Sequence, residues 1–214
     1  MKFLIKKLKK DELRKKVAHL PLFLCIAINT IMTTMENFKE NVFKALEGYT
    51  SLGEFETWLY KSEALLDLMS EDVVSEAYTF NYRQRDAKYQ FKKAIFRYLD
   101  KDEFLLWKVK SNLRDLVGNR SNRDRILYDF LAYDGYHFLQ SIGYYMYQVE
   151  DIEYYGNNLG ATLAELKRDC EILLLQIEKQ ELDRPGFRLV DYRPADTPRV
   201  ESPIITKKWW NFWK

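Results

Sequence analysis

The chain has 214 residues, of which 47% are hydrophobic and 31% are charged. This length and composition exclude a disordered or collagen-like chain and are sufficient for one domain with a well-formed core. The formal net charge of +2 hides an asymmetry, because residues 1–16 carry a net +6, residues 207–214 carry +3 and residues 17–206 carry −7. An acidic body disfavours general nucleic-acid binding and favours basic partners.

Residues 1–34 differ from the rest of the chain. A basic amphipathic stretch, residues 1–16, is followed by a mostly apolar stretch, residues 17–32. The order is that of a signal peptide or a short anchor, but His, Pro and Asn interrupt the apolar part and it is short for a membrane span. Three interpretations stay open. The segment is a disordered tail or an over-extended gene start ahead of Met32 or Met35, a membrane anchor, or a helix docked on the body.

The body is predicted to be helical throughout. No proline occurs between Pro21 and Pro185, and apolar residues recur at spacings of three and four. A capping residue followed three positions later by a carboxylate marks five helix starts, at Thr33–Glu36, Ser51–Glu54, Asp100–Glu103, Ser121–Asp124 and Thr162–Glu165. Gly48 and Gly118 stand where helices are expected to end.

These signals predict an all-α fold, a single multi-helix bundle formed by residues 35–183. About seven helices are expected, over residues 34–47, 52–69, 71–84, 86–99, 102–117, 123–149 and 161–182. The sixth is expected to break at Asp134–Gly135. The expected core includes Phe38, Val42, Leu46, Phe55, Leu59, Leu66, Met69, Phe91, Ile95, Tyr98, Leu113, Phe130, Cys170 and Ile177.

Residues 184–214 have a different composition. They contain four prolines and the sequence KKWWNFWK at residues 207–214. The composition predicts an extended tail. Tryptophans flanked by lysines are suited to docking on the body, on a partner or at a membrane surface, and the sequence does not choose among these.

Catalytic signatures are absent from the sequence. It has two histidines, His19 and His137, and it lacks a Walker-type phosphate loop, a GxGxxG turn and a GxSxG elbow. Asp134 and His137 form at most half of a metal site, because a di-iron bundle needs that motif twice. Cys25 and Cys170 have neither metal-ligand nor disulfide-framework spacing. We therefore predict no enzymatic activity, no cofactor, no metal and a reducing, cytoplasmic location.

A basic stripe is the second feature with two interpretations. It consists of Arg83, Arg85, Lys88, Lys92 and Lys93, with Tyr82 and Tyr89 nearby. Such a stripe is typical of a phosphate-binding face. It is equally the composition of a solvated helix face, and the acidic body favours this second interpretation, so that no specific nucleic acid is expected as a partner.

Two stretches resemble small all-helical immunity proteins of bacterial toxin–immunity (polymorphic toxin) loci. In residues 53–95, Trp58-Leu59-Tyr60 is followed by a short acidic helix, and Asn81-Tyr82 then leads into a helix begun by Asp86. In residues 126–144, Tyr133-Asp134-Gly135-Tyr136 leads into Phe138-Leu139. The resemblance implies no enzymatic activity. It implies tight binding of a toxin domain encoded by a neighbouring gene.

Residues 144–155 form the densest candidate for such a contact, with five tyrosines and three carboxylates. Acidic groups accelerate association with a basic partner, and buried aromatic rings supply affinity. We predict that the partner-binding residues are Tyr147, Glu150, Asp151, Glu153 and Tyr154. The alternative is an ordinary tyrosine-rich helix end.

The leading hypothesis is therefore an immunity-type protein of the cytoplasm that blocks a toxin domain. The first alternative is an inner-membrane-associated helical scaffold, held by residues 1–31 and 207–214. A nucleic-acid-associated protein that uses the Arg83–Arg97 stripe is the next, and it would bind with a steep salt dependence. The last is a helical-bundle enzyme of a kind that the motifs do not reveal.

Overall fold

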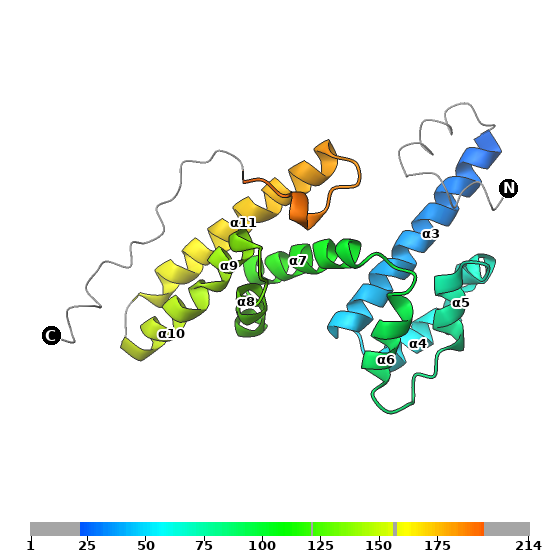
Figure 1. Cartoon of the computed structure of the whole chain (residues 1–214), viewed down its shortest axis with the longest axis horizontal. Helices are drawn as coiled ribbons and strands as arrows, with labels where there is room; N and C mark the ends of the chain where they lie inside the picture. Colours follow the sequence, from blue (N-terminus) through cyan, green and yellow to red (C-terminus); the bar gives the residue numbers. More distant parts are fainter. Residues whose placement is uncertain (1–21, 121, 156–157, 195–214) are drawn as a thin grey trace. The chain divides into compact units, whose positions relative to one another are not determined.

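A computed structural model describes residues 22–120, 122–155 and 158–194, and the side chains of residues 30–120, 122–151 and 158–194 (Figure 1). Within those residues every regular element is a helix and no strand occurs, which confirms the predicted all-α fold. The α-helices are α3 (Leu22–Glu47), α4 (Leu52–Lys61), α5 (Asp72–Thr79), α6 (Ala87–Ile95), α7 (Lys101–Val117), α8 (Arg123–Leu131), α9 (His137–Gly143), α10 (Tyr145–Tyr155) and α11 (Leu159–Asp183). Two short 3₁₀ helices are η1 (Glu63–Leu68) and η2 (Leu189–Asp191).

The chain forms two compact units, divided between Val109 and Lys110 inside α7. The sequence predicted a single bundle over residues 35–183, so the structure differs from that expectation. The physical reason is that the buried side chains of the first unit close on one another, in one cluster that extends from Phe38 to Phe104. Each unit is described by itself below.

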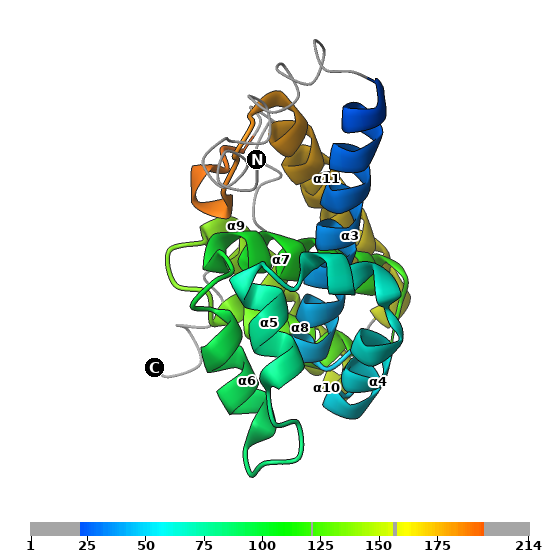
Figure 2. The same cartoon turned by 90° about the vertical axis from the view of Figure 1, so that its right-hand side faces the viewer.

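In the first unit, α4, η1, α5 and α6 gather around the C-terminal half of α3 (Figure 2). Phe38, Val42 and Leu46, at the spacing of one helix face, are all buried as predicted. The first half of α7 joins α3 through two ion pairs, Lys39 to Glu103 at 2.8 Å and Lys108 to Glu47 at 3.0 Å. The core of the first unit is therefore built on the apolar face of α3 that the sequence predicts.

The start of α4 is a complete capping box. The Ser51 hydroxyl accepts from the Glu54 amide at 3.2 Å, and the Glu54 carboxylate accepts from the Ser51 amide at 2.8 Å. These hydrogen bonds satisfy amides that the first turn leaves free. The bond from the Ser51 amide, together with one from the Ser51 hydroxyl, lowers the pKa of the exposed Glu54 carboxyl. The start predicted from the Ser51–Glu54 spacing is confirmed.

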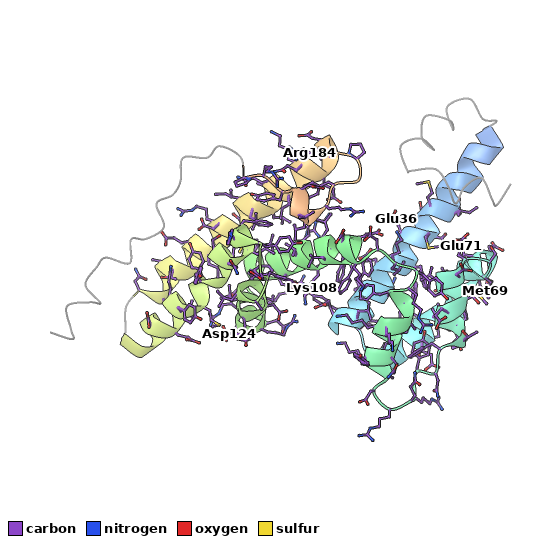
Figure 3. The ribbon with its side chains drawn as sticks, in the orientation of Figure 1. Glu36, Met69, Glu71, Lys108, Asp124 and Arg184 are labelled. Carbon is purple, nitrogen blue, oxygen red and sulfur yellow. The ribbon has the colours of Figure 1, made fainter. Side chains whose placement is uncertain are left out.

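The predicted helix over residues 52–69 is wrong in its second half. The Ser62 hydroxyl donates to the Trp58 carbonyl at 2.7 Å, α4 ends at Lys61, and η1 follows with three residues per turn. The shorter repeat changes the phase, so Leu65 and Leu68 are buried. Leu66 is 59% exposed, and the exposed Met69 lies at the outer edge of its unit (Figure 3).

A similar phase change corrects the prediction that Tyr98 is buried. The α6 helix ends at Ile95, and turns follow through Leu99, whose amide donates to the Ile95 carbonyl at 3.1 Å. In this arrangement Leu99 is buried and Tyr98 is exposed.

The α3 helix begins twelve residues before the expected start at residue 34, because the apolar run joins the amphipathic helix without a break. Among the residues that the structure describes, no helix is long and apolar enough to cross a membrane. Residues 1–21 lie outside the described residues, so the anchor interpretation remains a prediction there.

The second unit is built on α8, α9, α10 and α11. The predicted break at Asp134–Gly135 is confirmed, since α8 ends at Leu131, α9 begins at His137, and Gly135 has a φ of +80° that suits glycine. A further break at Tyr144 separates α9 from α10. The core residues of this unit include Leu127, Phe130, Leu139, Ile142, Val149, Leu166, Cys170, Leu173 and Ile177.

The predicted extended tail is wrong for its first eleven residues. Phe187, Leu189 and Tyr192 are buried. The Tyr192 hydroxyl donates to the Gln176 side chain, and the Arg193 amide donates to Gln180 at 3.1 Å. Residues 184–194 therefore turn back onto α11, because apolar side chains between the prolines find a surface to cover. Residues 195–214, which include the tryptophan cluster, lie outside the described residues.

Buried tyrosines make the fold sensitive to alkaline pH. Tyr82 is 8% exposed and its hydroxyl donates to the Ala77 carbonyl at 2.7 Å, so that burial raises the pKa of Tyr82 far above its usual value near 10. A raised pKa in the folded state means that stability is present below pH 10 and is lost as pH rises, because only the unfolded chain then ionises.

We expect the contribution of Tyr82 to the free energy of unfolding to be constant from pH 7 to 9 and to fall above pH 10, by about 1.4 kcal/mol at pH 11. The control is Tyr82→Phe, which loses about 1 kcal/mol at neutral pH with the hydrogen bond but has a shallower alkaline decline. Urea unfolding at each pH measures both. Parallel curves for the two proteins would contradict the prediction.

Candidate protein-binding surface

The α10 helix is held from the inside and exposed on the outside. Val149 is buried, and the Tyr145 hydroxyl donates to the Asp169 carboxylate of α11 at 2.7 Å. Burial, followed by this hydrogen bond, raises the pKa of Tyr145 well above its usual value. The helix is therefore fixed on α11 at neutral pH, which leaves its other face for contacts outside the unit.

That exposed face carries two tyrosines and two carboxylates. Tyr144, Tyr147 and Asp151 follow one another at spacings of three and four, which places them on one side of the helix, and Glu150 flanks them. Tyr147 is 52% exposed, and its ring centroid lies 6.3 Å from that of the exposed Tyr144. We call Tyr144, Tyr147, Glu150 and Asp151 the tyrosine–carboxylate surface.

The charge of this surface is not neutralised by any side chain that the structure describes. Among the residues that the structure describes, no cation forms an ion pair with Glu150 or Asp151. Exposed carboxylates beside exposed aromatic rings combine electrostatic attraction with apolar area, the two components of a protein-binding surface.

The structure brings three of the five predicted residues to this surface, namely Tyr147, Glu150 and Asp151, all exposed. Glu153 and Tyr154 belong to α10, but their side chains lie outside the described residues. Sequence reasoning missed Tyr144, although its spacing of three from Tyr147 was a usable signal.

Tyr128 is a further exposed tyrosine, and it belongs to the part of α8 that contacts the end of α9. A Cβ on Gly143 would lie 2.9 Å from the carbonyl oxygen of Leu127, so Gly143 and Leu127 are in direct contact. Gly143 directly precedes Tyr144, and Leu127 directly precedes Tyr128. The backbone therefore brings α8 beside one end of the tyrosine–carboxylate surface.

The basic stripe of the first unit is exposed, but several of its cations have local partners. Lys88, Tyr89 and Lys92 line a shallow groove of about 520 Å³ together with Leu46 and Asp86. The Lys88 ammonium lies beside Gly48, where it complements the negative end of the α3 dipole.

Lys92 and Arg85 have local partners of a different kind. The Lys92 ammonium lies 5.7 Å from the centre of the Phe104 ring, and Arg85 pairs with Asp86 at 3.8 Å. Together with the position of Lys88, these contacts give three of the five cations of the stripe a neighbour within the first unit.

No metal centre or reactive nucleophile emerges from the part of the chain that the structure describes. The His137 ring lies 3.0 Å from the Gln140 side chain, and no group of three His, Cys, Asp or Glu residues is placed there to hold a metal ion. Burial raises the pKa of the Cys170 thiol to about 12, so that this thiol stays protonated at neutral pH.

The described residues thus define an all-α protein with an exposed tyrosine–carboxylate surface. Comparison with family models, curated proteins and solved structures finds no match to this chain. Its resemblance to immunity proteins remains a prediction, and a functional assignment has to rest on the residues themselves.

Proposed function

We propose that this protein is an immunity-type inhibitor that binds a basic toxin domain through the tyrosine–carboxylate surface and blocks that domain. The main support is the pair of exposed tyrosines beside two carboxylates, on a helix whose opposite face is fixed by Val149 and Tyr145. A rigid surface loses little conformational entropy on binding, which favours high affinity.

The chemistry of the four residues fits a basic partner. Glu150 and Asp151 attract a cationic cleft and accelerate association with it. A toxin domain that acts on nucleic acid has such a cleft, because it binds phosphates. Tyr144 and Tyr147 supply aromatic area with few rotatable bonds and a hydroxyl that hydrogen-bonds at the rim. The membrane-scaffold alternative places its contacts at residues 1–31 and 207–214, of which the structure describes residues 22–31 as the start of α3, and no feature of the described residues favours it.

The partner is identified by affinity purification of the tagged full-length chain from its native cells, followed by mass spectrometry. We expect one stoichiometric partner that contains a basic domain. Recovery of the chain with membrane lipids and membrane proteins, and without such a partner, would overturn the proposal in favour of the scaffold.

With the partner in hand, Tyr147→Ala is expected to raise the dissociation constant about 30-fold, equivalent to ~2 kcal/mol, as for a central aromatic contact. Glu150→Lys together with Asp151→Lys is expected to slow association and to reduce its salt dependence. Surface plasmon resonance at two salt concentrations measures all three quantities.

Matched controls come from the first unit. Tyr89→Ala removes a tyrosine that is 67% exposed on α6, and Glu63→Lys with Asp67→Lys reverses two exposed charges on η1. These controls are expected to bind as the unaltered chain does. If the α10 variants also keep full affinity, the tyrosine–carboxylate surface is not the binding site.

A further inference from the structure

The α11 helix has a second apolar face that nothing in the described part of its unit covers. Its buried side consists of Leu166, Cys170, Leu173 and Ile177. Ile172, Leu175 and Leu182 are exposed, and their spacings of three and seven place them on one stripe away from the core. Leu175 is 65% exposed and Leu182 is 84% exposed. We call these three residues the α11 stripe.

Single exposed leucines are ordinary, but three on one face of one helix form a patch of the kind that another segment covers. Only one side of a surface helix normally needs apolar residues. Since the core already occupies the opposite side of α11, the fold of the described unit does not explain the stripe.

The path of the chain brings a candidate segment to this place. After Arg184, at the end of α11, the chain turns back beside the helix (Figures 1 and 3). The Tyr192 hydroxyl donates to Gln176, which is four residues after Ile172 and hence one helical turn away from it. The described chain stops at Pro194, directly after Arg193, whose amide donates to Gln180 of the same helix at 3.1 Å, so that residues 195–214 begin at the surface of α11.

The residues that follow have the matching chemistry. Residues 195–214 include six large apolar side chains, namely Ile204, Ile205, Trp209, Trp210, Phe212 and Trp213. Residues 207–214 carry a net +3, and α11 has an exposed carboxylate, Asp183, directly after Leu182. Apolar area and opposite charge therefore coincide in the two segments.

The reach is sufficient. Residues 195–203 span up to roughly 30 Å when extended, and the stripe rises about 15 Å along the helix axis. A segment joined to its binding surface by so short a connection has an effective concentration in the millimolar range, so that weak contacts are enough to hold it.

From these observations we infer that residues 204–213 dock on the α11 stripe of the same chain. The docked segment covers Ile172, Leu175 and Leu182 with its isoleucine and tryptophan side chains, and its lysines face Asp183 at the end of α11. This contact is independent of the proposed toxin binding, because it uses α11 and not the tyrosine–carboxylate surface.

Limited trypsin digestion of the full chain tests the contact, because cleavage after Lys208 releases the peptide of residues 209–214 for mass spectrometry. Trypsin cleaves only the undocked segment, so docking lowers the cleavage rate in proportion to the fraction of molecules in which the segment is undocked. We expect Ile172→Asp with Leu175→Asp to release the peptide about ten-fold faster than the unaltered chain. The single variant Leu182→Asp, at the end of the helix, gives the same direction of change if the double variant fails to fold.

Leu66→Asp is the matched control, since it places the same charge at an exposed leucine of the first unit and is expected to leave the rate unchanged. The rate should also be independent of protein concentration. Protection that disappears on dilution would show that a second copy covers the stripe, and equal rates for all the variants would show that the segment does not dock there. Either result overturns the inference.

Discussion

Replacement of Phe91 with alanine is expected to lower the free energy of unfolding of the first unit by about 3–5 kcal/mol. Phe91 is completely buried, and its ring lies 5.0 Å from Phe80, 5.4 Å from Phe55 and 5.5 Å from Tyr82, measured between centroids. Removal of the ring leaves a cavity in the centre of this aromatic group and loses the ring-to-ring contacts. The expected loss is a large part of the roughly 5–15 kcal/mol that stabilises an ordinary domain.

Urea unfolding followed by circular dichroism measures the loss, and Tyr89→Ala is the control. Tyr89 lies two residues before Phe91 on the same helix, but it is exposed, so its removal should change the free energy by less than about 0.5 kcal/mol. If Phe91→Ala cost no more than this control, the aromatic group would not be the core of the unit.

The sequence predicted best where a local signal and the core agree. The Ser51–Glu54 capping box is formed, and Phe38, Val42 and Leu46 are buried at the spacing that predicted them. In both cases the determining contacts lie within one helical turn or along one helix face, and such contacts are visible in the order of residues.

The sequence failed where distant contacts or competing hydrogen bonds decide the structure. The apolar pattern of residues 52–69 continues past Ser62, and it does not reveal that the Ser62 hydroxyl bonds to the Trp58 carbonyl and that a 3₁₀ turn follows. The prolines of residues 184–194 indicated an extended tail, but Tyr192 packs against Phe138 of α9, with 4.3 Å between ring centroids. This contact joins residues too far apart in sequence for local rules.

The candidate site shows the same limit. The density of tyrosines and carboxylates in residues 144–155 pointed to α10, and helical spacing then separates the exposed Tyr147 from the buried Val149. The identity of a partner depends on the shape and charge of a second molecule, so the sequence of one chain defines a surface and leaves its ligand to experiment.

Replacement of Gly143 with alanine is expected to lower the free energy of unfolding of the second unit by about 3 kcal/mol, the upper end of the usual range for overpacking. A Cβ at this position would lie 2.7 Å from the amide nitrogen of Leu131 and 2.9 Å from the carbonyl oxygen of Leu127. Both are backbone atoms of α8, which cannot rotate away as a side chain can. The end of α9 would have to move off α8 to admit one methyl group.

Gly160→Ala, in the first turn of α11, is the control within the same unit, because its Cβ would meet only the Asn158 side chain at an ordinary 3.6 Å. We expect this variant to match the unaltered chain or to be slightly more stable, since alanine favours helix over glycine. Thermal unfolding of both variants measures the difference. Tyr144 follows Gly143 directly, so the movement that relieves the clash also displaces the start of the tyrosine–carboxylate surface. Gly143→Ala should therefore weaken partner binding along with the fold, whereas Tyr147→Ala should weaken binding and leave the unfolding temperature unchanged.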